Sequence, residues 1–179
     1  MLDDLAEILL TPEEIATEVE RLAARLVRDY EGQTPLLVGV LKGSAVFLAD
    51  LVRALPLPVA VDFISVAGYG AERSTSGVVR IRKDLDENIE GRDVLIVEGI
   101  IDTGLTLSYL LRNFRTRQPR SLRVCAFLDK PAQRIIDLQV DYVGRRIPDR
   151  FVVGYGLDYR ERYRNLPLIG VLKASVLDR

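Results

Sequence analysis

The chain has 179 residues, of which 48% are hydrophobic and 28% charged, so a disordered or low-complexity chain is excluded. The formal net charge of −1 provides no overall field that would attract nucleic acid or an anionic membrane. Histidine is absent and there is one cysteine, which excludes imidazole catalysis and an internal disulfide framework. Proton transfer therefore falls to carboxylates, lysine, tyrosine or water, and a metal would take oxygen ligands, which favours Mg²⁺, Mn²⁺ or Ca²⁺.

The first half of the chain alternates helical and strand patterns. The motif Thr11-Pro12-Glu13-Glu14 is typical of a helix start, with threonine as the N-cap, proline at the first position and glutamate at the third. A polar loop over residues 68–77 is long for a compact domain, which makes it a candidate lid. The expected elements are a helix after the motif that stops at Gly32, a strand over 36–41, a helix from Ser44 to Pro56, a strand over 59–66 and a returning strand over 78–81.

The second half continues the alternation. Apolar strands between amphipathic helices predict an α/β fold with a mostly parallel sheet. Ligands bind beyond the carboxyl ends of such strands, so we expect the chemistry in the loops after residues 41, 101, 128 and 153. The expected elements are a strand over 94–101, a helix from Thr106, a strand over 122–128, and short strands over 140–143, 151–153 and 168–172.

The chain shows no linker and no repeat, so residues 1–179 are expected to form a single domain. No apolar run is long enough to cross a bilayer, and the first ten residues are acidic, unlike the basic start of a secretion signal. We therefore expect a cytoplasmic protein without a membrane partner.

The most informative segment runs from Val94 to Thr106, where an apolar strand ends in Asp102 and turns into a helix. Backbone N–H groups at the helix start, close approach at Gly104 and threonine hydroxyls together suit one phosphate. The same fragment is equally typical of a capped helix after a strand. Glu98 is different, because a carboxylate inside an apolar strand is costly unless it is paired, which favours a functional role.

The run Ile-Ile-Asp-Thr-Gly-Leu-Thr at 100–106 resembles the diphosphoribosyl-binding signature of type I phosphoribosyltransferases. Segments 41–43, 128–130 and 147–167 narrow the resemblance to the hypoxanthine (hypoxanthine-guanine) phosphoribosyltransferases, and order and spacing agree from about 36 to 171. The resemblance implies a mostly parallel sheet flanked by helices, a small hood from the chain ends and a flexible loop.

The resemblance also implies an activity. Such an enzyme transfers phosphoribosyl from 5-phosphoribosyl-1-diphosphate (PRPP) to N9 of hypoxanthine, with guanine as a second base, and gives IMP or GMP and pyrophosphate. It implies purine salvage in the cytoplasm, Mg²⁺ as cofactor, a homodimer or homotetramer, and no nucleic-acid partner.

Each matched residue acquires an implied role, although taken alone most would be read as ordinary turn, surface or core residues. Asp102 would be the acid/base facing purine N7, Lys130 would select a 6-oxo group, and the peptide between Leu41 and Lys42 is often cis in the family. The implied sites are Asp102, Thr103, Gly104, Leu105 and Thr106 for the 5′-phosphate; Lys42, Gly43 and Arg164 for pyrophosphate; Lys130, Phe151, Val152 and Asp158 for the purine; Glu98 and Gly99 at the ribose; Asp158 and Glu98 for the metal; and Tyr69, Ser74, Thr75 and Ser76 in the flexible loop.

Two positions depart from the family pattern. Gly99 stands where the family usually has a second carboxylate, and Gly68 stands where it usually has serine. Either Glu98 and water suffice at the ribose or affinity for PRPP is reduced. An aspartate restored at Gly99 is expected to keep or improve PRPP binding.

Other interpretations remain open from the sequence. The chain could be a nucleotide-sensing regulator on the same fold with weak activity, or a phosphoribosyltransferase for xanthine or a pyrimidine. Arginines gather between residues 112 and 123, which favours a solvated helix face or a subunit interface over a nucleic-acid surface.

Overall fold

The computed structural model describes residues 1–67 and 80–177. The expected loop residues Tyr69, Ser74, Thr75 and Ser76 lie outside the described residues, as does the first half of the strand expected over 78–81. The described part of that strand forms β4 (Arg80–Lys83).

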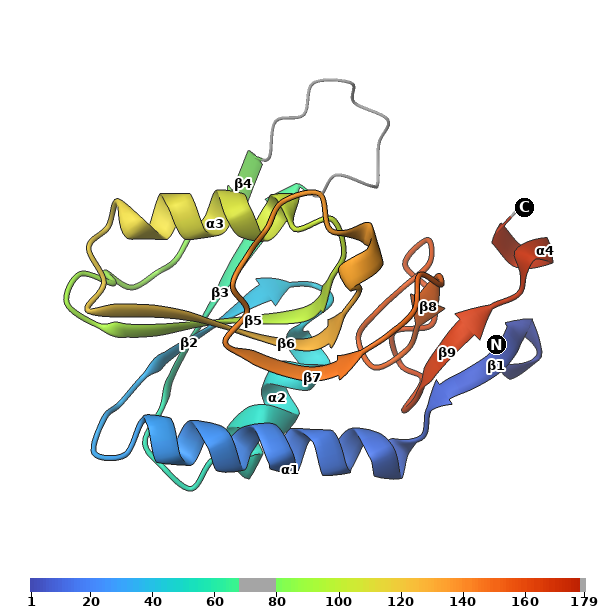
Figure 1. Ribbon diagram of the computed structural model, residues 1–179, viewed down its shortest axis with the longest axis horizontal. Helices are drawn as coiled ribbons and strands as arrows, with labels where there is room; N and C mark the ends of the chain where they lie inside the picture. Colours follow the sequence, from blue (N-terminus) through green and yellow to red (C-terminus); the bar gives the residue numbers. More distant parts are fainter. Residues whose placement is uncertain (68–79, 178–179) are drawn as a thin grey trace.

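A six-stranded sheet forms the centre of the molecule, in the order β4-β3-β2-β5-β6-β7 (Figure 1). Strands β2, β3, β5, β6 and β7 run parallel, and β4 pairs antiparallel with β3 at one edge. This confirms the expected mostly parallel sheet. The bounds are β2 (Leu36–Leu41), β3 (Ala60–Ala67), β5 (Asp93–Ile101), β6 (Ser121–Asp129) and β7 (Tyr142–Arg146).

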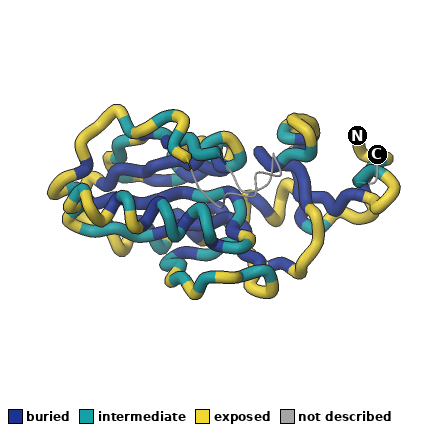
Figure 2. The backbone as a smooth tube through the Cα atoms, turned by 90° about the horizontal axis from the view of Figure 1, so that it is seen from above, coloured by how far each residue is buried: buried dark blue, intermediate teal, exposed yellow. Residues whose placement is uncertain are grey.

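Helices cover both faces of this sheet. Helices α1 (Pro12–Asp29) and α2 (Ala45–Ala54) lie on one face and α3 (Leu105–Arg115) on the other (Figure 1). The central strands are buried, as the dark tube in Figure 2 shows. Continuous apolar strands therefore pack on two sides, which is why β2 and β5 carry no alternation of polar residues.

The first helix begins where the sequence predicts. The Thr11 hydroxyl accepts from the Glu14 N–H at 3.3 Å, and the Glu14 carboxylate accepts from the Thr11 N–H at 2.9 Å. This reciprocal cap satisfies two N–H groups that have no partner within the helix. The second helix differs, because the buried Ser44 hydroxyl donates to the Val40 carbonyl at 2.8 Å instead of capping.

A second sheet, in the order β1-β9-β8, forms a hood from distant parts of the chain. Strand β1 (Leu5–Leu10) pairs antiparallel with β9 (Ile169–Leu172), so both chain ends meet at one side of the molecule (Figures 1 and 2). Strand β8 (Val152–Val153) completes it. Buried residues of the hood, such as Ile169 and Val171, belong to the same apolar core as Leu37 and Leu95 of the central sheet.

Most predicted strand starts are displaced by one or two residues, and those expected at 59, 94, 122 and 168 lie at 60, 93, 121 and 169. The strand expected over 140–143 begins at Tyr142, because the Asp141 carboxylate accepts from the Val124 N–H at 2.8 Å and ends the pairing there. Phe151 lies outside β8 and is 43% exposed. Short elements complete the described chain: 3₁₀ turns over Leu2–Asp4 and Pro131–Gln133, and α4 (Ala174–Leu177). None of the helices within 1–67 and 80–177 is both long and apolar enough to cross a membrane.

Candidate functional site

The turn between β5 and α3 presents backbone N–H groups at the carboxyl edge of the sheet. Gly104 is the N-cap with φ +84°, a left-handed conformation that favours glycine, and a Cβ there would also press on the side-chain atoms Leu138 Cδ1 at 2.9 Å and Arg134 Cδ at 3.0 Å. The carbonyl of Thr103 accepts from the Ile135 N–H at 3.0 Å, which ties the turn to the segment that follows β6. Helix α3 begins at Leu105, one residue before the predicted start. The Leu105 N–H donates to the Thr103 hydroxyl at 3.4 Å, and N–H groups of a first turn have no partner within their own helix, so this end of α3 suits an anion.

A cavity of about 220 Å³ opens beside this turn. Its walls come from the ends of β2 and β5 and the start of α3. It therefore brings together residues that the sequence assigns to phosphate, pyrophosphate and ribose, namely Asp102, Thr103, Gly104, Thr106, Gly43 and Glu98. The purine set of Lys130, Phe151, Val152 and Asp158 lies outside this lining.

Glu98 is a partly buried carboxylate in the wall of this cavity. Desolvation raises its pKa to about 8, and a backbone hydrogen bond from Gly99 offsets only part of that cost. Within the described ranges no lysine or arginine pairs with it. The cavity thus contains a desolvated carboxyl without a cationic partner among the described residues, and a cation bound beside it would stabilise its ionised form.

Lys130, which the resemblance assigns to the 6-oxo group of the purine, is buried, with 6% of its surface exposed. Its N–H donates to the Ile101 carbonyl at 2.9 Å, which joins the ends of β5 and β6. Its ammonium Nζ lies 3.7 Å from Asp102 Oδ2, and the Asp102 side chain is 53% exposed. The buried ammonium of Lys130 and the solvent-exposed carboxylate of Asp102 therefore lie close together at the carboxyl edge of the sheet.

The Lys42-Gly43 turn meets the phosphate side of the site. The peptide between Leu41 and Lys42 is cis, as the resemblance implies. The Gly43 carbonyl oxygen lies against two glycines, since a Cβ on Gly99 would be 2.7 Å from it and one on Gly156 2.5 Å. Any side chain at Gly99 must therefore displace the Gly43 backbone, and the effect of an aspartate there on PRPP binding stays a prediction.

A second charged cluster lies on the loop after β8. Arg164 Nη2 lies 2.8 Å from Asp158 Oδ1 and 3.3 Å from Glu161 Oε1, and Lys42 Nζ donates to Glu161 Oε2 at 2.8 Å. Lys42 and Arg164, both assigned to pyrophosphate, therefore share one carboxylate. Sequence reasoning missed Glu161, although its spacing of three residues from both Asp158 and Arg164 was an available signal.

The predicted stacking residue Phe151 is exposed beside the hood. Its ring meets the Tyr159 ring edge-on, with centroids 5.5 Å apart, while Val152 is buried in β8. An exposed aromatic ring can stack on a flat base, and the neighbouring backbone groups can form hydrogen bonds with the edge of that base.

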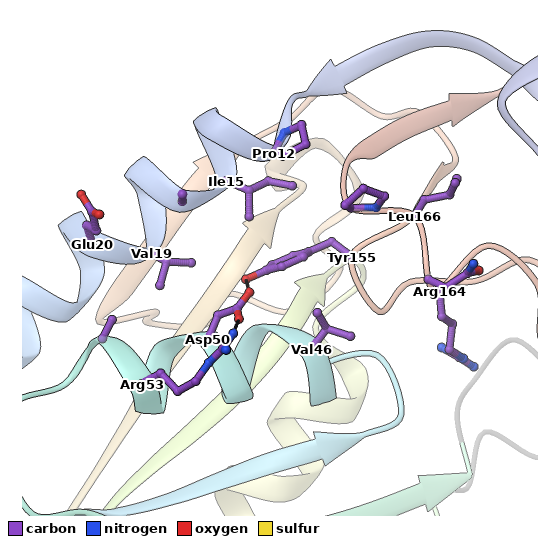
Figure 3. Close-up of a pocket in the computed structure, with 14 residues that line it drawn as sticks. Pro12, Ile15, Val19, Glu20, Val46, Asp50, Arg53, Tyr155, Arg164 and Leu166 are labelled. Atoms are coloured by element: carbon purple, nitrogen blue, oxygen red, sulfur yellow. Dashed lines mark hydrogen bonds and ion pairs between the residues drawn. The ribbon is translucent and has the colours of Figure 1, made fainter.

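The larger cavity of about 630 Å³ lies elsewhere, between α1, α2 and residues 164–167 (Figure 3). Its lining is mainly apolar, and Tyr155 Oη donates to Asp50 Oδ2 at 2.8 Å within it. Of the predicted residues only Arg164 reaches it, at the rim, with a side chain that extends away from Tyr155 (Figure 3). Most of the predicted site residues therefore lie outside this apolar cavity.

Comparisons with known proteins agree with this picture. Residues 6–160 match the phosphoribosyl transferase domain family. The chain is 50% identical over 178 residues to hypoxanthine-guanine phosphoribosyltransferase of Bacillus subtilis, covering 99% of both chains. It is 52% identical over 179 residues to that of Mycobacterium avium, covering 97% of this chain and 88% of the relative. A crystal structure of a hypoxanthine phosphoribosyltransferase from Staphylococcus aureus superposes with a TM-score of 0.93 at 47% identity, covering 98% and 96% of the two chains.

Proposed function

This chain belongs to the phosphoribosyl transferase family, and from that membership we propose that it transfers phosphoribosyl from PRPP to N9 of hypoxanthine and of guanine in purine salvage. Residues 1–179 would act as one domain. The observation that carries the proposal is the meeting of three features at one sheet edge: the anion-ready turn at Gly104, the open carboxylate of Asp102 and the buried ammonium of Lys130.

The turn accounts for the sugar phosphate. Thr103, Gly104 and Thr106 line the cavity, and the N–H groups of this turn, with the Thr103 and Thr106 hydroxyls, would hold the 5′-phosphate at the positive end of α3. The ribose would then extend toward Glu98, and the two pyrophosphate phosphates toward the Lys42-Gly43 turn and Arg164.

Lys130 and Asp102 account for the base. An ammonium has donors only, so Lys130 binds a 6-oxo group and meets a donor when the base is adenine. In the reaction N9 bonds to C1′, the bond from C1′ to the pyrophosphate oxygen breaks, and Asp102 accepts the proton from N7. The backbone of Val152 and the ring of Phe151 would complete the base site.

Mg²⁺ is the proposed cofactor. Among the described residues no three acidic side chains form a ready metal cluster, so substrate oxygens must supply most ligands. Glu98 fits a cation because it has no cationic partner within the described ranges. Asp158 fits less well, since its two oxygens already contact Arg164 Nη2 and the Glu161 N–H, each at 2.8 Å. When bound, the ion would offset the charge of the leaving pyrophosphate.

The test is an ultraviolet absorbance assay with PRPP, Mg²⁺ and each of hypoxanthine, guanine, xanthine, adenine and uracil. Hypoxanthine and guanine should react, and adenine and uracil should not. Asp102→Asn should lower kcat by at least about a hundredfold while PRPP still binds. Turnover of adenine, or an unchanged kcat in Asp102→Asn, would contradict the proposed roles, and a preference for xanthine would replace the base assignment.

We expect a cytoplasmic protein that assembles as a homodimer or homotetramer. Sedimentation velocity distinguishes these two oligomeric states. A nucleic-acid-binding regulator is disfavoured, because Arg117, Arg120 and Arg123 of the arginine-rich segment are paired with Asp84, Asp93 and Asp29.

A further inference from the structure

Glu161 occupies the position of a small anion between two cations. One carboxylate oxygen accepts from Lys42 Nζ at 2.8 Å and the other lies 3.3 Å from Arg164 Nη2. Lys42 follows β2, whereas Arg164 lies more than a hundred residues later, so a single side chain joins the two halves of the pyrophosphate site. A phosphate group would present its oxygens to these same donors.

The backbone holds Glu161 in this position. Its N–H donates to Asp158 Oδ2 at 2.8 Å, and Arg160 and Glu161 both have positive φ, +53° and +61°. The loop is closed by reciprocal hydrogen bonds between Tyr159 and Arg162, each 3.1 Å long. Arg164 is fixed separately, because its Nη1 donates to the Gly156 carbonyl at 2.8 Å.

The charges of the cluster cancel without a ligand. Lys42 and Arg164 contribute two positive charges, and Asp158 and Glu161 two negative ones. Pyrophosphate can take both cations only if the Glu161 carboxylate moves off them, since two anions at the same donors repel. The side chains of Lys42 and Glu161 are each 65% exposed, so nothing within the described structure prevents this exchange.

We propose that Glu161 is a positioning residue that takes the place of pyrophosphate in the free enzyme, holds Lys42 and Arg164 together, and competes with pyrophosphate for them. The proposal rests on the assignment of these two cations to pyrophosphate under the proposed function. Glu161 thereby weakens the binding of product pyrophosphate and speeds its release, and it weakens the binding of PRPP through the same two cations.

The test compares two variants that remove the charge in different ways. Glu161→Gln keeps the length of the side chain, and Glu161→Gly removes it at a left-handed position that glycine adopts freely, so the loop is retained. The control is Glu87→Gln, since Glu87 is 62% exposed and pairs with Arg92 at 3.6 Å, outside the cluster. The measured quantities are the inhibition constant of Mg²⁺-pyrophosphate against PRPP, and the KM values of PRPP and hypoxanthine.

Both Glu161 variants should lower the pyrophosphate inhibition constant and the KM of PRPP by about three- to tenfold, as expected for the loss of one competing carboxylate that makes two ion pairs. The KM of hypoxanthine should not change, and Glu87→Gln should change none of the three constants. Unchanged or weaker pyrophosphate inhibition in both variants, in an enzyme that still forms IMP, overturns the role of Glu161. Wild-type protein that forms no IMP and does not bind pyrophosphate instead refutes the proposed function on which the role rests.

Discussion

Replacing Glu98 by Gln tests the claim that the cavity contains a desolvated carboxylate. Burial raises the pKa of Glu98 from its usual 4.5 to about 8, so the folded protein prefers the neutral form over this pH range. A glutamine is neutral at every pH and keeps an oxygen for the Gly99 N–H. The free energy of unfolding of the variant should therefore equal that of the wild type at low pH and exceed it at high pH.

The size of the effect follows from the two pKa values. Because the folded pKa is the higher, stability from the protonated form is fully present below 4.5 and is lost as the pH rises to about 8. At about 1.4 kcal/mol per pH unit the loss is at most about 5 kcal/mol. Glu98 is partly exposed to the cavity, so solvent screening leaves roughly 2–3 kcal/mol, or about 5–10 °C in Tm.

The assay is thermal unfolding of both proteins without Mg²⁺ at pH 5, 7 and 9. The two Tm values should nearly coincide at pH 5 and diverge progressively, with Glu98→Gln the more stable at pH 9. Glu87→Gln serves as the exposed-carboxylate control, and its plot of Tm against pH should run parallel to that of the wild type. Parallel curves for Glu98→Gln as well would refute the desolvation argument and remove the reason to place a cation beside this residue.

Two further variants probe the site. Gly99→Ala places a Cβ 2.7 Å from the Gly43 carbonyl oxygen, so we expect a loss of about 1–3 kcal/mol in unfolding free energy and a raised KM for PRPP with an unchanged KM for hypoxanthine; an unaltered Tm and KM would show that the Gly43 backbone yields freely. Lys130→Met removes the donor to the 6-oxo group, so the KM of hypoxanthine should rise roughly ten- to hundredfold, and steady-state kinetics with an unchanged KM would place O6 elsewhere.

Much of the fold could be predicted from local pattern, because burial on two faces makes the parallel strands continuously apolar. Residues 36–41 were bounded correctly, and the Thr11 cap set the start of α1. The sequence analysis does not predict strand β1. This strand pairs with β9, some 160 residues away, and buried and exposed residues do not alternate along it. Such a pairing leaves no mark on the short segment itself.

Some features of the site, like those of the fold, depend on one local segment, and others depend on contacts between distant segments. The phosphate turn is local, so Asp102 and Gly104 could be placed from a single segment. The burial of Lys130 could not, because it depends on how the end of β6 is covered by the chain that follows. The ion pair of Glu161 with Lys42 depends on the approach of two loops, and the contact between Gly43 and Gly99 on the approach of a loop to strand β5, which no single motif encodes.

The most direct measurement is a crystal structure of the protein with IMP. The account predicts the 5′-phosphate against the N–H groups of residues 103–106, and the hypoxanthine O6 within hydrogen-bond distance of Lys130 Nζ with N7 facing Asp102. A nucleotide bound in the apolar cavity between α1 and α2, with the turn at Gly104 holding no phosphate, would contradict it.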